Sequence, residues 1–172
     1  MELVEGRVEV GGERFPDADA FVEALSTVGE EHGVTVQAFD ARYVLSRRHL
    51  ERALELADRE RGRGEGIARD RAVEVLLYAA GRRQIDRALE MGVGEGETPV
   101  VVLVDDPEGA QAAERAAVSG VEALLSPAET LGACDPDRVC EFFDIGDAER
   151  EATDAGLEAL VLERIALLVV ER

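Results

Sequence analysis

Groups of arginine side chains carry the most specific chemistry in this sequence. They are Arg47 and Arg48 with His49, Arg69 with Arg71, and Arg82 and Arg83 with Gln84. A guanidinium group presents a planar set of donors that binds a phosphate through two hydrogen bonds and also stacks on a nucleobase. These groups therefore favour contact with phosphate or RNA. Pairing within a helix, such as Glu55 with Arg59, is the alternative explanation for some of them.

The arginines are concentrated in one segment of an otherwise acidic chain. All 19 cationic side chains are arginines, and the formal charge at pH 7 is −19. Twelve arginines lie between Arg42 and Arg87, where 8 acidic residues leave the segment at +4, while the other 126 residues carry 7 arginines and 30 acidic residues. This concentration predicts one anion-facing surface on a protein that otherwise repels phosphate.

Motifs for catalysis or cofactor binding are weak. The stretch Gly62–Gly66 follows a predicted helix and lacks the Gly-Lys-Ser/Thr ending of a nucleotide loop, so we interpret it as a connector. His32, His49 and the two cysteines show no zinc-ligand spacing, and no serine lies in a Gly-x-Ser-x-Gly turn. We predict no cofactor, no metal and no catalytic residue. A triad assembled only in space and a carboxylate magnesium site are the alternatives.

Composition predicts a soluble cytoplasmic protein of one domain spanning residues 1–172. No window approaches the roughly 18 apolar residues needed to cross a bilayer, and Met1–Val10 alternates charge with valine instead of showing a basic and then apolar leader. The absence of lysine and the charge of −19 are typical of adaptation to high salt. Cys134 and Cys140 are expected to be reduced.

The elements that must position the arginines form an α+β fold, with a mixed, mainly antiparallel sheet of four to five strands packed with helices. Strands are expected at residues 2–10, 34–39, 99–104 and 165–170, where residues alternate or are β-branched. Helical spacing predicts helices at residues 17–31, 44–61, 69–80 and 85–91, and from Asp147 onward. Further helix starts are expected at Asp106-Pro107, Ser126-Pro127 and Asp135-Pro136.

The predicted helix at residues 44–61 has one apolar and one cationic side. Its apolar stripe contains Leu50 and Leu54, whereas Arg48, Arg52 and Arg59 project within roughly 40° of one another on the opposite side. The helix is therefore expected to pack on the core and present guanidinium groups to solvent.

Several motifs of this chain resemble one known family. They are Val36-Gln37-Ala38-Phe39-Asp40-Ala41, Arg48-His49-Leu50, the central Glu74-Val75-Leu76-Leu77-Tyr78-Ala79-Ala80-Gly81-Arg82-Arg83-Gln84-Ile85, and the closing Glu163-Arg164-Ile165-Ala166-Leu167-Leu168. The resemblance is to the CGI-type accessory subunit of the KEOPS complex, a family that includes the animal PRPK-binding protein. It covers most of the chain from Val34 onward and is weak over residues 108–136. The acidic, lysine-free composition suggests an archaeal, halophilic member.

The resemblance implies a non-catalytic subunit. KEOPS installs a threonylcarbamoyl group on the adenosine beside the anticodon of tRNA. The CGI-type subunit docks directly on the small kinase-like ATPase, reaches the threonylcarbamoyl transferase only indirectly, and grips the 3′ CCA end of tRNA. By position, the expected tRNA contacts are Arg47, Arg48, His49, Arg82, Arg83, Gln84 and Ile85, with Arg69 added from the charge pattern. We expect the ATPase to bind the last helix at Leu157, Leu160 and Val161.

Two other functions stay open to the sequence. A pure protein-interaction regulator of the ATPase would use the arginines only for internal salt bridges. A small nucleotide-dependent enzyme would need a phosphate loop or clustered ligands that the sequence does not contain.

Overall fold

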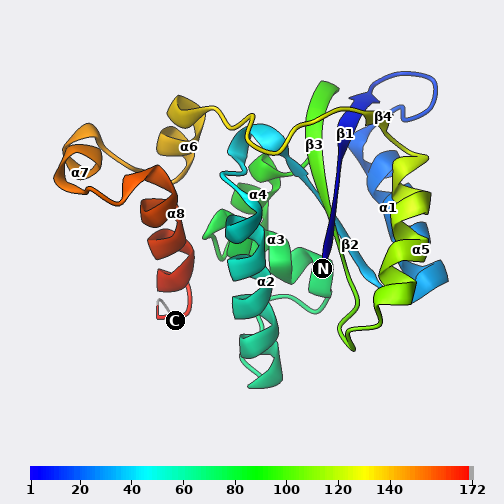
Figure 1. The fold of residues 1–172 in the computed structure, drawn as a ribbon, viewed down its shortest axis with the longest axis horizontal. Coiled ribbons are helices and arrows are strands. Elements are labelled where there is room, and N and C mark those ends of the chain that lie inside the picture. Colours follow the sequence, from blue (N-terminus) through cyan, green and yellow to red (C-terminus); the bar gives the residue numbers. More distant parts are fainter. Residues whose placement is uncertain (171–172) are drawn as a thin grey trace. The chain divides into compact units, whose positions relative to one another are not determined.

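Alternating valines at the start of the chain build the first strand of an antiparallel sheet (Figure 1). The structure, a computed structural model, describes residues 1–170. Its strands are β1 (Glu2–Val10), β2 (Thr35–Asp40), β3 (Gly96–Asp105) and β4 (Ser126–Pro127), in the order β2-β3-β1-β4. The pairings β1–β3, β1–β4 and β2–β3 are all antiparallel, which confirms the α+β prediction with four strands.

Two helices pack on one face of this sheet, α1 (Ala18–His32) and α5 (Gln111–Glu122). Because side chains alternate along a strand, Val8, Val36 and Val102 lie on one face of β1, β2 and β3, where they join an aliphatic core. Phe21 and Leu25 of α1 bury against them. The four strands, α1 and α5 belong to the first of two compact units, which comprises Met1–Ala41 and Gly92–Leu131.

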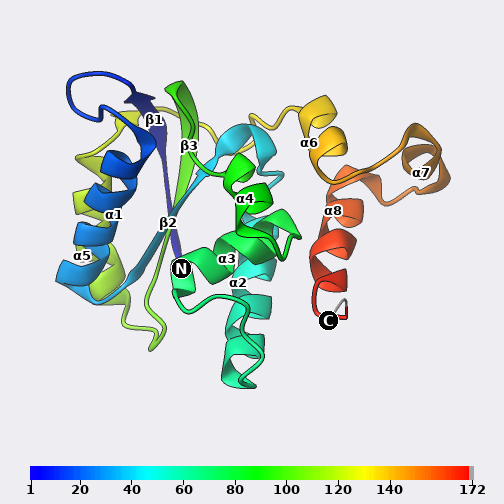
Figure 2. The same cartoon turned by 180° about the vertical axis from the view of Figure 1, so that it is seen from behind.

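The second unit is helical and comprises Arg42–Met91 and the chain from Gly132 onward. Its elements are α2 (Arg47–Gly62), α3 (Arg71–Ala80), α4 (Ile85–Ala88), α6 (Pro136–Phe142), α7 (Asp147–Ala152) and α8 (Gly156–Leu167), with short 3₁₀ turns η1 (Ala41–Tyr43) and η2 (Leu89–Met91). Helix α2 packs against both α3 and α8 (Figure 2). The prediction of a single domain stays a prediction.

Local signals explain where the helices of the second unit begin and end. The side chains of Ser46, Asp70 and Asp135 accept hydrogen bonds from the first turns of α2, α3 and α6. Gly81 ends α3 with a left-handed φ of 59°, a conformation that glycine adopts without strain. The predicted break at Gly81 and helix start at Asp135-Pro136 are therefore confirmed.

Two predicted helix starts in the second half of the chain are wrong. Ser126-Pro127 pairs with Gly6 and Arg7 of β1 as β4 and starts no helix. Asp106 accepts a hydrogen bond from the Glu108 amide in a turn, and α5 begins only at Gln111.

The predicted strand at residues 165–170 is instead the end of α8 and the turn after it. Its unbroken apolar run suits a buried helix as well as a strand. The predicted helix from Asp147 onward is divided in two, because α7 ends at Ala152 and α8 begins at Gly156, whose φ is 80°. Among residues 1–170, no helix is long and apolar enough to span a bilayer.

We predict that Gly29→Ala destabilises the protein, although alanine normally favours a helix. A Cβ atom at Gly29 would lie 2.8 Å from the Val34 carbonyl oxygen, so α1 or the start of β2 must shift. The free energy of unfolding should fall by about 1–3 kcal/mol. Thermal and denaturant unfolding measure the change.

Gly62→Ala is the control, because no atom lies within 4 Å of its added Cβ, and it should be neutral or stabilising by up to about 1 kcal/mol. Equal effects of the two substitutions would contradict the close packing at Gly29.

Candidate functional site

The first turn of α2 separates the three residues of its predicted contact motif. Arg47 is exposed and its Nε donates to Glu51 Oε1 at 2.7 Å. Arg48 is also exposed, and its side chain has no hydrogen bond or ion pair among residues 1–170. Arg48 lines a groove of about 540 Å³ between α2 and α8. Since consecutive residues of a helix diverge by about 100°, these two guanidinium groups face different surroundings.

The structure removes His49 from the set of predicted contacts, because its side chain has no exposed surface. Its Nε2–H donates to the carbonyl oxygen of Ala79 at 2.8 Å, and Nδ1 accepts from the Leu45 amide at 3.4 Å. This pair of hydrogen bonds requires the neutral imidazole. Burial lowers the pKa of His49 to about 4. The ring joins the start of α2 to the end of α3, so the motifs at residues 47–49 and 81–85 adjoin.

Arg82 is mostly engaged inside the second unit. Its Nη2 donates to the carbonyl oxygen of Phe142 and lies 3.2 Å from Asp144 Oδ2, and its guanidinium carbon is 5.4 Å from the centroid of the Phe142 ring. The Nε atom is buried without a hydrogen-bond partner. The side chain is only 22% exposed. Arg82 therefore has a structural role that its sequence motif does not reveal.

Arg164 of α8 also bonds backbone carbonyls at the end of α6. Its Nε donates to the carbonyl oxygen of Phe143 at 3.2 Å, and its Nη2 donates to that of Asp144 at 3.2 Å and to Glu149 at 2.8 Å. The carbonyls of residues 142–144 follow α6, where the helix leaves acceptors without intrahelical partners. We call Arg82 and Arg164 the arginine clamp, because they bond these three consecutive carbonyls.

The rest of the predicted motif is more accessible. Gln84 and Ile85 are exposed at the start of α4, and Ile85 retains 48% of its surface. Arg83 is exposed, with its Nη1 3.4 Å from the Leu168 carbonyl oxygen, and it lines a pocket of about 80 Å³ with Glu60 and Glu65. Gln84 and Ile85 are thus accessible to solvent after the end of α3, next to the exposed but hydrogen-bonded Arg83.

Arg69 lies away from the other predicted contacts, in the loop between α2 and α3. The loop backbone is fixed by the buried carboxylate of Glu74, which accepts from the amides of Ile67 and Ala68, and by Arg61, which donates to the carbonyl oxygens of Ala68 and Arg69. The loop follows the C-terminus of α2, about 20 Å along the helix from Arg47. Arg69 therefore does not belong to one cluster with Arg47 and Arg83.

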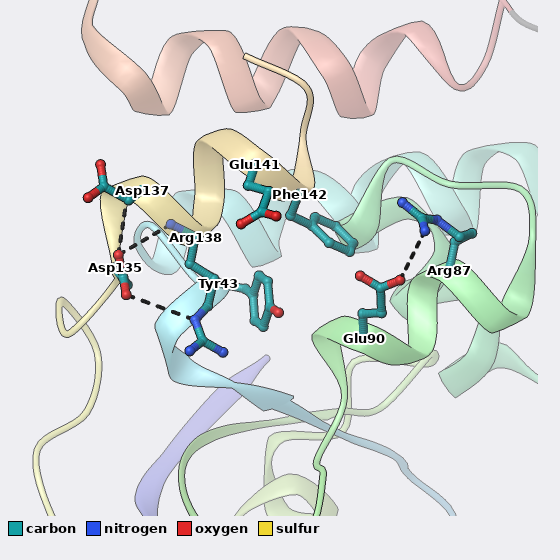
Figure 3. A pocket seen from close by; sticks show the side chains of 8 residues that line it. All are labelled: Tyr43, Arg87, Glu90, Asp135, Asp137, Arg138, Glu141 and Phe142. Atoms are coloured by element: carbon teal, nitrogen blue, oxygen red, sulfur yellow. Dashed lines mark hydrogen bonds and ion pairs between the residues drawn. The ribbon is translucent and has the colours of Figure 1, made fainter. Parts of the chain in front are cut away.

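A pocket of about 510 Å³ lies between η1, the η2 region and α6 (Figure 3). Its aromatic wall is Tyr43, whose ring meets Phe142 edge to face at 5.2 Å and carries Arg138 at 5.5 Å from its centroid. The remaining lining residues are charged and are Arg87, Glu90, Asp135, Asp137 and Glu141. Two guanidinium groups and four carboxylates thus surround one tyrosine.

Helix α6 is fixed at both ends, which defines this pocket. The amide of Asp135 donates to the Arg42 carbonyl oxygen at 2.9 Å, and the carboxylate of Asp135 accepts from the amides of Asp137 and Arg138. The arginine clamp bonds the carbonyls at the other end. Tyr43 was not among the contacts predicted from the sequence. An aromatic residue between Arg42 and Arg47 was the available signal, since aromatic rings interleaved with arginines are typical of RNA contact.

The structure also corrects the predicted partner-binding face. Leu160 and Val161 are buried inside the second unit, and Leu157 is half-buried. They form the inward side of α8, so they are not available to a partner in this structure.

A comparison with known protein families finds a match. The sequence model of a family described as "Kinase binding protein CGI-121" matches residues 20–168. A search of curated proteins finds no match.

We predict that His49 makes the protein sensitive to mild acid. The pKa of the native imidazole is about 4 and the ordinary value is 6.5, so between these values the unfolded chain binds a proton that the native chain does not. The contribution of His49 to stability is complete above pH 6.5 and is lost as the pH falls toward 4. Chemical unfolding of wild type and His49→Gln from pH 7.5 to 4 measures it. The variant is expected to be less stable at pH 7.5 but to lose less stability on acidification. Parallel curves would show that His49 titrates normally.

Arg82→Ala should destabilise the second unit more than Arg83→Ala does. The first change leaves the Phe142 carbonyl without its guanidinium donor and removes the contact with the Phe142 ring, which should cost about 2 kcal/mol. Arg83 is the matched control, because it is the adjacent residue and is exposed. Thermal unfolding compares the two variants. An Arg82→Ala transition as high as that of Arg83→Ala would argue against the clamp.

Proposed function

The chain belongs to the CGI-121 family of kinase-binding proteins, and we propose that it is a non-catalytic subunit of a cytoplasmic KEOPS complex. It docks on the small kinase-like ATPase and presents the 3′ CCA end of tRNA, which supports threonylcarbamoyl-adenosine modification by the transferase. The family match supports the kinase partner. The tRNA role follows from the resemblance in the central motif and from the chemistry of the exposed residues beside it.

The distribution of charge favours the second unit as the RNA-facing part. The first unit has 3 arginines and 18 acidic residues, a formal charge of −15, whereas the second has 16 arginines and 20 acidic residues, a charge of −4. Phosphates are therefore repelled much more strongly by the first unit. Arg47, Arg83 and Arg87 are the exposed guanidinium groups that we assign to the backbone of the tRNA tail.

The pocket beside Tyr43 carries the tRNA proposal, because it offers stacking and hydrogen-bond acceptors together (Figure 3). Unpaired bases of RNA commonly stack on aromatic side chains or on guanidinium planes. Cytosine and adenine also carry exocyclic amines that donate to carboxylates. Glu90 and Glu141 line the pocket, so it suits such a base while the phosphates stay near Arg47 and Arg83.

The surroundings of His49 and Cys134 support the proposal that the chain is not catalytic. His49 is neutral, buried and engaged on both nitrogens. Burial and the neighbouring Asp135 raise the pKa of the Cys134 thiol, which makes it a poorer nucleophile at neutral pH. Neither group is prepared for proton transfer or nucleophilic attack.

The alternative is a protein-interaction regulator of the ATPase without RNA contact. One observation favours it: several arginines of the segment are used internally. Arg71 forms two 2.7 Å hydrogen bonds with Asp58, and Arg82 belongs to the arginine clamp. These bonds account for part of the arginine concentration without any ligand.

We expect two substitutions to weaken tRNA binding, one through lost charge attraction and the other through lost base stacking. Arg47→Glu should lower affinity for every tRNA and reduce the slope of log affinity against log salt by about one unit or more. A glutamate at the first turn of α2 is compatible with the helix dipole, so the fold should be retained. Tyr43→Ala should weaken binding roughly 5- to 150-fold through lost stacking, and only for tRNA that has its CCA end. Filter binding with intact and CCA-truncated tRNA measures both effects.

Arg115→Glu is the matched control for charge reversal, because Arg115 is exposed on α5 and, within residues 1–170, bonds only the Gln111 carbonyl of its own helix. It should bind tRNA nearly as wild type does. Absence of tRNA binding by the wild-type protein, at any salt that preserves the fold, would reject the RNA role in favour of the regulator. Equal binding of intact and truncated tRNA would reject the assignment of the CCA end to the Tyr43 pocket.

A further inference from the structure

Helix α8 is apolar on its outward side as well as on its inward side. The inward residues Leu160, Val161 and Ile165 are buried. The outward residues lie within roughly 140° of one another at the helical period, and we call them the outer α8 face: Ala159, Leu162, Glu163, Ala166 and Leu167.

Only Glu163 of the outer α8 face is charged, and Leu167 is 40% exposed. Val170, in the turn after the helix, is 76% exposed and continues the apolar surface. In a chain of charge −19, such an exposed face indicates an interface.

The groove beside this face adds a polar wall. Leu162 and Ala166 of α8 lie opposite Arg48 and Arg52 of α2 in the cavity of about 540 Å³. Arg52 is paired with Glu55 at 2.7 Å, whereas Arg48 has no ion pair within residues 1–170. Glu51, Glu55 and Glu163 line the same groove, and the first two pair with Arg47 and Arg52. The groove therefore offers aliphatic surface beside Arg48, a combination that suits an aliphatic ridge with a carboxylate that reaches this guanidinium group.

The chemistry of this surface selects a protein partner. RNA contact needs cations or stacking rings, and the outer α8 face has neither. A second copy of the chain would bring another charge of −19 to the interface, which opposes self-association. A kinase is the partner that the family description supplies.

We propose that the outer α8 face, with the α2–α8 groove and Arg48, is the docking surface for the kinase. The kinase presents aliphatic side chains to Leu162 and Leu167 and a carboxylate to Arg48. This assignment rests on the proposed function, since it requires that the chain docks on the kinase. It keeps kinase docking apart from the Tyr43 pocket, so one subunit can hold both partners at once.

Calorimetry can measure the affinity of the full chain for the small kinase-like ATPase. Leu167→Glu and Arg48→Glu should each weaken binding at least tenfold. Val22→Glu is the matched control, because Val22 is an aliphatic residue 52% exposed on α1, and it should bind as wild type does. Unchanged thermal unfolding of each variant, and unchanged tRNA binding by Leu167→Glu, would complete the support.

The possible failures are distinguishable. A wild-type chain that does not bind the ATPase would overturn the proposed docking and this surface with it. Wild-type binding with both variants unaffected, or with Val22→Glu equally impaired, would overturn the surface and leave the docking function intact. A dimeric wild type that becomes monomeric in Leu167→Glu would reassign the face to a second copy. Loss of tRNA binding in Leu167→Glu would reassign it to RNA.

Discussion

The second unit depends on a neutral imidazole held between two helices. His49 lies at the first turn of α2 and bonds the Ala79 carbonyl near the end of α3, so it fixes which ends of the two helices meet. This contact joins the first turn of α2, which carries Arg47, to the end of α3, just before Arg82 and Arg83. His49, which the sequence predicted as a tRNA contact, instead holds together the helices that carry the proposed contacts.

Arginine has both structural and exposed roles in this protein. Arg82 and Arg164 bond the carbonyls after α6, and α6 in turn forms one wall of the Tyr43 pocket. Arg47, Arg48 and Arg83 remain exposed. A guanidinium group suits both roles, because its five donors serve backbone carbonyls as readily as phosphates or carboxylates. The concentration of arginines therefore reflects the construction of the unit as well as its surface.

The sequence predicted the elements with strong local patterns. The alternation in β1, the β-branched run of β2 and the valines of β3 identified the strands, and Asp135-Pro136 identified α6. Prediction failed where local chemistry permits two outcomes: Ser126-Pro127 pairs with β1, and the apolar run from Ile165 is helical. At the candidate site, the sequence located the two motifs but did not separate Arg82 from Arg83. Only the tertiary contact with Phe142 distinguishes these neighbours.

The arginine clamp also has a consequence for alkaline solution. A guanidinium group keeps its proton in proteins, whereas a lysine at either position would begin to lose its charge in alkaline solution. The hydrogen bonds to the Phe142, Phe143 and Asp144 carbonyls therefore persist in alkali. Protonation of His49 weakens the second unit only at acidic pH. At basic pH, the arginine clamp still holds α6, which forms one wall of the Tyr43 pocket.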